Sequence, residues 1–301
     1  MPFPLTRIPL PTGVELDVAI AGDAQKPPVV LLHGFPESHR TWRHQIPALA
    51  ADHYVIAPDQ RGYARSSKPE GIAAYAPDRI VGDLLALADH LGIGRFTLVG
   101  HDWGGAIAWM AALGRPDRVE RLAIVNAPHP YLFQRALFDS PEQRAASQYV
   151  TRFRDTGIDG GLVGAGLERF FSTSFAQHVA SAILGEDKSA YLDEWSQPGA
   201  MTAMLNWYRA SQIVVPPVDW RPGDQPPRPA FLEGPFPPVS VPTLVIWGMA
   251  DKALPPGPNL DGLDALVPDL TIQRLDGVGH FAPWEAPDRV TAALSGWLRR
   301  R

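Results

Sequence analysis

The stretch Val99-Gly100-His101-Asp102-Trp103-Gly104-Gly105 decides the fold of this chain of 301 residues. The apolar run at 96–99 enters it and predicts a short buried strand. The apolar run at 106–113 leaves it and predicts a helix that ends at Gly114. A strand, a tight turn lined with glycines and a helix, in this order, are typical of a nucleophile elbow. Such an elbow holds one reactive side chain exposed at the top of a parallel sheet.

The residue at the centre of this turn is Asp102, where the usual elbow pattern Gly-x-Ser-x-Gly has a serine. An aspartate with its ordinary pKa of about 3.9 is already ionised at neutral pH, so it needs no base before it attacks. A carboxylate is well suited to displacing a leaving group from a saturated carbon, because the product is an ester that water can hydrolyse. The alternative is that Asp102 only caps the following helix. The flanking glycines favour the nucleophile.

Strands alternate with helices along most of the chain, and one segment departs from this pattern. Strands are predicted at 14–21, 28–32, 54–58, 121–126, 243–248 and 270–275, and helices at 39–51, 77–91 and 287–298. The alternation predicts right-handed crossovers and a mostly parallel, doubly wound α/β sheet. Helical patterns rich in Phe, Leu, Met and Trp replace it in the middle of the chain. We therefore predict a core of residues 1–129 and 240–301 and a helical lid of residues 130–239.

The composition argues against several classes of function. The net charge of −5 and the lack of Lys and Arg clusters argue against a nucleic-acid partner. The chain has no cysteine for disulfides or metal ligation, and no motif such as His-Glu-x-x-His predicts a metal site. The first residues lack the pattern of a signal peptide, and no apolar run approaches the ~20 residues of a membrane span. We expect a cytoplasmic protein that needs no cofactor.

Two residues that follow later strands are candidate partners of Asp102. Asp251 comes after the strand at 243–248, and His280 comes after the strand at 270–275. Nucleophile, acid and histidine follow one another in this order in one class of catalytic triads. A carboxylate that holds a histidine fixes its tautomer and stabilises the imidazolium, which makes the histidine an effective base. The alternatives to Asp251 are Asp261, Asp264 and Asp276.

The loop His33-Gly34-Phe35-Pro36 follows the strand at 28–32, which we expect beside the elbow strand. We predict that the backbone N–H groups of Phe35 and Trp103 form an oxyanion hole. The peptide bond before Pro36 is predicted to be cis. His33 and His101 are predicted to hydrogen-bond locally and shape the loops.

Four motifs of the core closely resemble those of the soluble epoxide hydrolases of the α/β-hydrolase fold: His33-Gly34-Phe35-Pro36-Glu37-Ser38, Gly62-Tyr63, Gly100-His101-Asp102-Trp103-Gly104-Gly105 and Asn126-Ala127-Pro128-His129-Pro130. The resemblance covers nearly the whole core and thins across 157–200. In the lid, Leu205-Asn206-Trp207-Tyr208-Arg209 is similar to the segment that carries one of that family's two epoxide-protonating tyrosines. This implies that Tyr208 is one of them. Tyr149 fits the other best, with Tyr131 and Tyr191 as alternatives.

The resemblance implies a reaction and a site. Asp102 would attack one carbon of an apolar epoxide while the tyrosines donate to its oxygen. Water activated by His280 and Asp251 would then hydrolyse the ester to a vicinal diol. The implied pocket residues are Phe35, Trp103 and Trp207. We expect a monomer or a homodimer.

Two alternatives to an epoxide hydrolase remain open at this point: a dehalogenase, and a binding protein that does not turn over. Haloalkane dehalogenases also use an elbow aspartate followed by a tryptophan, but they resemble one another in having an asparagine where this chain has Phe35. Fluoroacetate dehalogenases carry arginines one and four residues after the nucleophile, where this chain has Trp103 and Ala106. The other reading, from a different class, is a hydrolase-fold binding protein that does not turn over.

Overall fold

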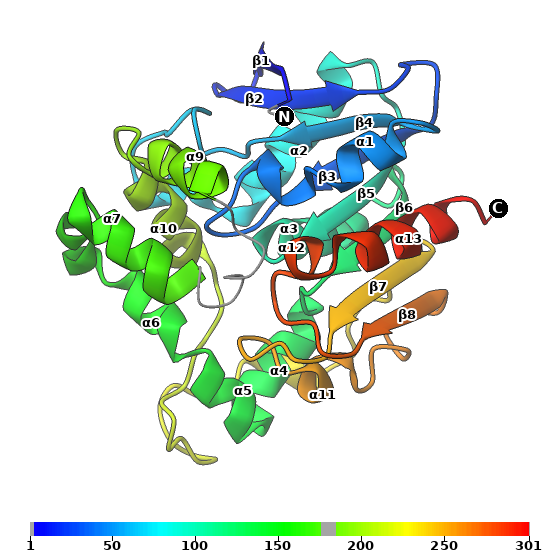
Figure 1. Cartoon of the computed structure of the whole chain (residues 1–301). Helices are drawn as coiled ribbons and strands as arrows, with labels where there is room; N and C mark the ends of the chain where they lie inside the picture. Colours follow the sequence, from blue (N-terminus) through cyan, green and yellow to red (C-terminus); the bar gives the residue numbers. More distant parts are fainter. Residues whose placement is uncertain (1–2, 176–184, 301) are drawn as a thin grey trace.

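The computed structural model describes residues 3–175 and 185–300, and a mixed sheet of eight strands lies at its centre (Figure 1). The strands are β1 (Leu5–Pro9), β2 (Glu15–Ala21), β3 (Pro28–Leu32), β4 (Tyr54–Pro58), β5 (Phe96–His101), β6 (Val119–Val125), β7 (Thr243–Gly248) and β8 (Leu270–Leu275). Their order across the sheet is β1-β2-β4-β3-β5-β6-β7-β8. β2 pairs antiparallel with both β1 and β4, and all the other neighbours in this order pair parallel.

Helices cover both faces of the sheet, as expected for a doubly wound arrangement (Figure 1). One face carries α1 (Gln45–Leu49), α12 (Ala282–Glu285) and α13 (Pro287–Leu298), and the other carries α2 (Pro77–His90) and α3 (Trp103–Gly114). Each face has its own apolar core, because side chains of the buried parallel strands alternate between the two sides. The α/β-hydrolase fold predicted from the sequence is confirmed.

Between β6 and β7 the described chain forms helices as far as Ala210, followed by an irregular stretch at 211–242 that contains a 3₁₀ turn at Ala230–Glu233. It contains α4 (Pro130–Asp139), α5 (Pro141–Ala146), α6 (Gln148–Arg154), α7 (Ala165–Phe170), α9 (Gly185–Trp195) and α10 (Ala200–Ala210). We keep the word lid for residues 130–239, and the division into core and lid stays a prediction. The Trp195 indole donates to the Pro36 carbonyl (2.7 Å), and the Trp207 indole donates to the Arg61 carbonyl (3.1 Å). These bonds attach the lid helices to the loops that follow β3 and β4.

Two local predictions differ from the structure. The helix predicted at 39–51 is interrupted: a 3₁₀ turn at His39–Trp42 is followed by the short helix α1. Pro47 explains the break, because it lacks an N–H and its ring would clash with the carbonyl of residue 43 in a continuous helix. The sequence analysis also missed β1, an edge strand with four exposed residues of five. The sequence of β1 lacks the alternation of apolar and polar residues that predicts a half-buried strand.

The elbow has the predicted form. β5 ends at His101, α3 begins at Trp103, and Asp102 between them has a positive φ of 51°. A side chain at Gly104 would collide with the carbonyls of Leu32 and His33. The close packing of α3 on the end of β3 therefore requires glycine there.

In the described part of the chain, 3–175 and 185–300, no helix has the length and apolar character needed to cross a membrane.

Candidate active site

Asp102 lies at the carboxyl end of β5, with its carboxylate facing the loop after β3. The Phe35 N–H donates to Asp102 Oδ1 at 2.7 Å. A side chain at Gly34 would occupy the space of the Asp102 carboxylate, so the loop can approach only with glycine there. Burial would raise the pKa of Asp102, but hydrogen bonds from His280 and Phe35 and the charge of His280 hold this pKa below its ordinary value. Asp102 is therefore a carboxylate at neutral pH.

The structure brings His280 and Asp251 to Asp102, as predicted. His280 Nε2 lies 3.5 Å from Asp102 Oδ2, and His280 Nδ1 lies 2.8 Å from Asp251 Oδ2. Both partners reach the site from loops at the carboxyl ends of neighbouring strands, β7 and β8. The acids that were alternatives to Asp251 are all exposed: Asp261, Asp264 and Asp276.

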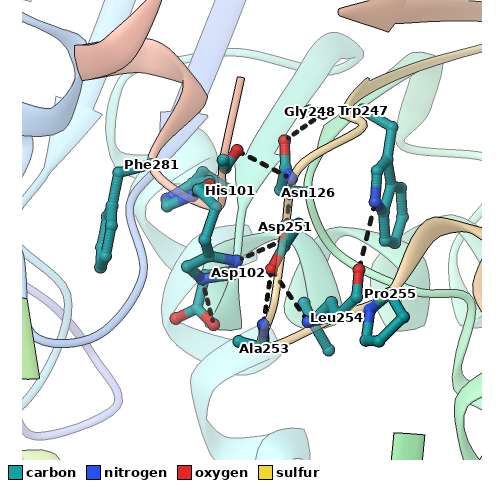
Figure 2. Close-up of polar contacts among 12 residues, drawn as sticks. His101, Asp102, Asn126, Trp247, Gly248, Asp251, Ala253, Leu254, Pro255 and Phe281 are labelled. Atoms are coloured by element: carbon teal, nitrogen blue, oxygen red, sulfur yellow. Dashed lines mark hydrogen bonds and ion pairs between the residues drawn. The ribbon is translucent and has the colours of Figure 1, made fainter. Parts of the chain in front are cut away.

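Three donors hold the Asp251 carboxylate in addition to its contact with His280 (Figure 2). Its Oδ1 accepts from the backbone N–H groups of Ala253 and Leu254, each at 2.9 Å. Its Oδ2 accepts from Asn126 Nδ2 at 2.8 Å in addition to the bond from His280. Asp251 as a whole is 4% exposed, so these bonds fix the direction of its carboxylate without help from solvent.

Asn126 is a site residue to which the sequence analysis assigned no role. It follows β6 directly, has a positive φ of 44°, and accepts from the Gly248 N–H at 3.1 Å. Its amide thereby joins the ends of β6 and β7 and points its Nδ2 at Asp251. A polar residue directly after a buried parallel strand was the signal that could have identified it.

His33 and His101 support the loops, as predicted. His33 Nε2 accepts from the Gln60 N–H (3.1 Å) while Nδ1 donates to the Gly34 carbonyl (3.0 Å), and burial lowers the pKa of His33. His101 Nε2 donates to the His280 carbonyl (2.9 Å), and its Nδ1 lies 3.2 Å from Glu37 Oε2. The peptide bond between Phe35 and Pro36 is cis, as predicted.

His280 has an unusual electrostatic environment. Burial alone would lower the pKa of His280, but the carboxylates of Asp251 and Asp102 outweigh it and raise this pKa well above its ordinary value. The two carboxylates therefore favour the cationic form of the imidazole in the unreacted site. Removal of one of the two negative charges lowers the pKa of His280 and favours the neutral imidazole, which is the form that can accept a proton.

Tyr149 on α6 and Tyr208 on α10 line the same cavities as Asp102. The two cavities, of about 290 Å³ and 700 Å³, meet at these three residues, which line both of them. The two tyrosine rings lie 6.1 Å apart, and the Tyr208 ring packs edge-on against Phe35 and Trp103. Burial raises the pKa of both tyrosines, so both hydroxyls carry their protons at neutral pH.

The other candidates in the lid lie elsewhere. Tyr131 directs its hydroxyl to the Leu232 carbonyl (3.4 Å), and the Tyr191 side chain is fully buried. Neither tyrosine lines the two cavities. Trp207 was predicted to be a pocket residue, but it does not line them either. Its indole points to Arg61, because Trp207 and Tyr208 are adjacent on one helix and project about 100° apart. Phe35 lines the smaller cavity and Trp103 the larger.

Within residues 3–175 and 185–300, no group of three or more His, Asp and Glu side chains could hold a metal ion.

Comparisons with known proteins show the family to which the chain belongs. The model of the α/β hydrolase fold family matches residues 27–287. Epoxide hydrolase A of Mycobacterium tuberculosis (strain ATCC 25618 / H37Rv) is 33% identical, with 99% of this chain and 98% of that protein covered. The AB hydrolase superfamily protein YfhM of Bacillus subtilis (strain 168) is 38% identical over 80% of each chain.

Solved structures agree. One described as a novel epoxide hydrolase of the α/β hydrolase superfamily from hot-environment metagenomes is 48% identical over 100% of both chains, with a TM-score of 0.89. Another is Bacillus megaterium epoxide hydrolase in complex with an inhibitor, 29% identical with 98% of this chain and 100% of that chain covered, with a TM-score of 0.83. The fold and the elbow define an α/β hydrolase. Within that class, the chain belongs to the epoxide hydrolase family.

Proposed function

We propose that this enzyme opens an apolar epoxide to a vicinal diol through a covalent ester on Asp102. An Asp102 oxygen forms a bond to one epoxide carbon while the bond from that carbon to the epoxide oxygen breaks. Tyr208 and Tyr149 donate hydrogen bonds to the departing oxygen, and one of them transfers its proton. The observation that carries this proposal is the meeting of one carboxylate and two protonated tyrosines where the two cavities join.

The ester is then hydrolysed by residues of the core. Alkylation removes the charge of Asp102, and this charge is one of the causes that raise the pKa of His280. The pKa of His280 falls, and the proton that it loses restores the tyrosine that gave up its own. The neutral imidazole then takes a proton from water, and the hydroxide adds to the Asp102 carbonyl carbon. The acyl bond to the diol breaks as the diol oxygen takes up the proton of the added hydroxyl, which returns Asp102 to a carboxylate and leaves His280 protonated. The N–H groups of Phe35 and Trp103 stabilise the oxyanion.

The cavities support an apolar substrate with two unequal parts. The larger cavity is lined by side chains such as Met110, Phe133, Phe231 and Phe236, and the smaller by Phe35, Phe153 and Phe281. Aromatic walls favour aryl and alkyl groups, because burying apolar surface is favourable. We propose that the larger substituent of the epoxide lies in the larger cavity. The cytoplasmic location and the monomeric or homodimeric state stay predictions from the sequence.

A product assay tests the proposal. We expect that styrene oxide gives the vicinal diol without added metal or nucleotide, and that 1-bromoalkanes release halide much more slowly or not at all. An alkoxide leaves only with help from a hydrogen-bond donor, which the tyrosines supply, whereas this chain has Phe35 in place of the asparagine with which haloalkane dehalogenases hold the departing halide. Diol formation is followed by chromatography and halide release by a colorimetric assay.

The same assay separates the alternatives. Robust halide release without diol would favour a haloalkane dehalogenase. A protein that gives neither product and forms no ester in a single turnover would be a binding protein. The asparagine typical of the dehalogenases is replaced by Phe35, and the elbow, acid and histidine are all in place, so we favour neither.

Replacing Asp251 by asparagine should shift the pH dependence of ester hydrolysis. In the ester, the Asp251 carboxylate is the charge that still raises the pKa of His280, and hydrolysis slows as the pH falls below this pKa because the imidazole becomes protonated. Without the charge the pKa of His280 falls, and the acidic limb of the pH profile moves to lower pH. The maximal rate also falls, though less than in His280→Ala, because the imidazole is no longer oriented. Stopped-flow measurement of ester decay between pH 5 and 9 checks both effects.

Asp264→Asn is the matched control, since it removes an exposed carboxylate of the same region. Its pH profile should coincide with that of the parent. An unshifted acidic limb in Asp251→Asn would show that Asp251 does not set the pKa of the base.

A further inference from the structure

The side chain of Arg154, the last residue of α6, reaches across to the end of α10. Its Nε donates to the Tyr208 carbonyl at 3.0 Å. Its Nη2 donates to the Ser211 hydroxyl (2.8 Å), the Ser211 carbonyl (3.2 Å) and the Ile213 carbonyl (2.7 Å). The Ser211 hydroxyl donates in turn to the Tyr208 carbonyl at 2.8 Å. One guanidinium therefore holds the backbone at and just after Tyr208.

The end of α10 needs such a donor. The last four carbonyls of an α-helix have no partner within the helix, and Tyr208 is one of these residues in α10 (Ala200–Ala210). A cation at this end also interacts favourably with the helix dipole. Burial lowers the pKa of Arg154, and in the part of the chain that the structure describes its hydrogen-bond acceptors are neutral carbonyl and hydroxyl oxygens. A half-buried arginine is thus used to hold one helix end.

The same arginine belongs to the helix that carries the other tyrosine. Tyr149 lies on α6, and Phe153, next to Arg154, packs between them with its ring 5.6 Å from Tyr149 and 5.1 Å from Tyr208. The tyrosine rings themselves are 6.1 Å apart. Tyr149 lies in the first turn of α6. Arg154, the last residue of α6, holds the backbone of Tyr208 on α10. Arg154 therefore connects the two helices that carry the tyrosine hydroxyls.

We infer that Arg154 is a positioning residue for the epoxide-opening step: it sets the placement of the Tyr208 hydroxyl relative to Tyr149 and Asp102. This inference rests on the proposed function, because it assigns Arg154 an effect on the step that the tyrosines assist. It predicts that a change at Arg154 slows alkylation of Asp102 and leaves hydrolysis of the ester unchanged. Hydrolysis depends on His280 and Asp251, which Arg154 does not contact.

A second arginine provides a matched control. Arg144, on α5, donates to the carbonyls of Leu137, Phe138, Val218 and Trp220. Arg144 is buried, whereas Arg154 is half-buried. Like Arg154, Arg144 holds the last turn of a helix, here α4, together with a later segment of the chain at 218–220. None of its four partners lines either cavity. Loss of Arg144 should therefore lower stability without a specific effect on alkylation.

The experiment measures alkylation and ester decay separately, by rapid mixing with styrene oxide, in Arg154→Met, Arg154→Lys and Arg144→Met. We expect alkylation to slow by about 10- to 100-fold in Arg154→Met, the scale on which small displacements of reacting groups act. Arg154→Lys should recover part of the rate, since it keeps a charged donor. Ester decay should stay at the parent rate in both, and Arg144→Met should keep both rates at 25 °C while its melting temperature falls.

A double-substitution cycle identifies the route of the effect. If Arg154 acts through Tyr208, Arg154→Met should slow alkylation less in a Tyr208→Phe background than in the parent, because the hydroxyl to be positioned is gone. Equal slowing in both backgrounds, equal slowing of alkylation and ester decay, or a parent rate in Arg154→Met would each overturn the inference. A parent enzyme that forms neither ester nor diol would instead overturn the proposed function. Arg154→Lys keeps the test decisive should Arg154→Met fail to fold.

Discussion

With His280 replaced by alanine, the enzyme is expected to accumulate an ester on Asp102 and to release almost no diol. Asp102 attacks as a carboxylate and needs no base, and in the variant the Phe35 N–H still donates to this carboxylate, so attack on the epoxide continues. Hydrolysis requires a base for water, and such catalysis typically contributes about 10²–10⁴-fold to a rate. After incubation with styrene oxide, mass spectrometry of the intact protein should show a single adduct, and peptide mapping should place it at Asp102.

The control is the double variant Asp102→Ala, His280→Ala, which lacks the proposed nucleophile and should stay unmodified. A time course of the parent enzyme should show the adduct only transiently. Unmodified protein in His280→Ala, or an adduct on a peptide without Asp102, would contradict the assignment of Asp102 as nucleophile.

The double variant Tyr149→Phe, Tyr208→Phe lacks the two tyrosine hydroxyls proposed to assist the reaction, and it should show almost no alkylation of Asp102 by epoxides. An alkoxide is strongly basic, so its departure needs a proton or a strong hydrogen bond as the C–O bond breaks. Phenylalanine keeps the ring contacts of Tyr208 with Phe35 and Trp103, so the fold should persist. We expect a loss of about 10²–10⁴-fold for Tyr208→Phe alone and a further loss for the pair. Single-turnover kinetics with styrene oxide measure both.

Tyr131→Phe is the matched control, because Tyr131 is also a lid tyrosine but directs its hydroxyl to the Leu232 carbonyl. It should alkylate Asp102 at the parent rate, as should Tyr191→Phe. Opening of epoxides at the parent rate by the double variant would remove the main support for the roles of Tyr149 and Tyr208. Circular dichroism of each variant excludes loss of fold as the cause.

The core of the site could be predicted because its residues directly follow buried strands. In a parallel sheet the carboxyl ends of neighbouring strands meet at one edge, so Asp102, Asp251 and His280 had to lie close together once their strands were recognised. Asn126 also follows a strand, but an asparagine there is equally a turn residue. Only the hydrogen bond from Asn126 to Asp251 in the structure separates the two roles.

The lid could be predicted less well, for physical reasons. Buried residues occur on most sides of α10, so periodicity cannot tell that Tyr208 faces the cavities and Trp207 faces Arg61. The resemblance indicated Tyr208 but left three candidates for its partner, and the cavities separate Tyr149 from the others. Arg154 had no signal in the sequence, because its acceptors are mainly backbone carbonyls, which any residue supplies.

The direct pairing of β6 with β7 bears on how enzymes of this kind can be altered. The chain leaves the sheet after β6 and returns to the adjacent strand, so the register of the sheet does not depend on the sequence inserted between them. Both proposed proton donors lie in that insertion, and the proposed hydrolytic residues all lie outside it. Exchange of this one segment between relatives would therefore change which leaving groups are expelled. It would retain the residues proposed to hydrolyse the ester.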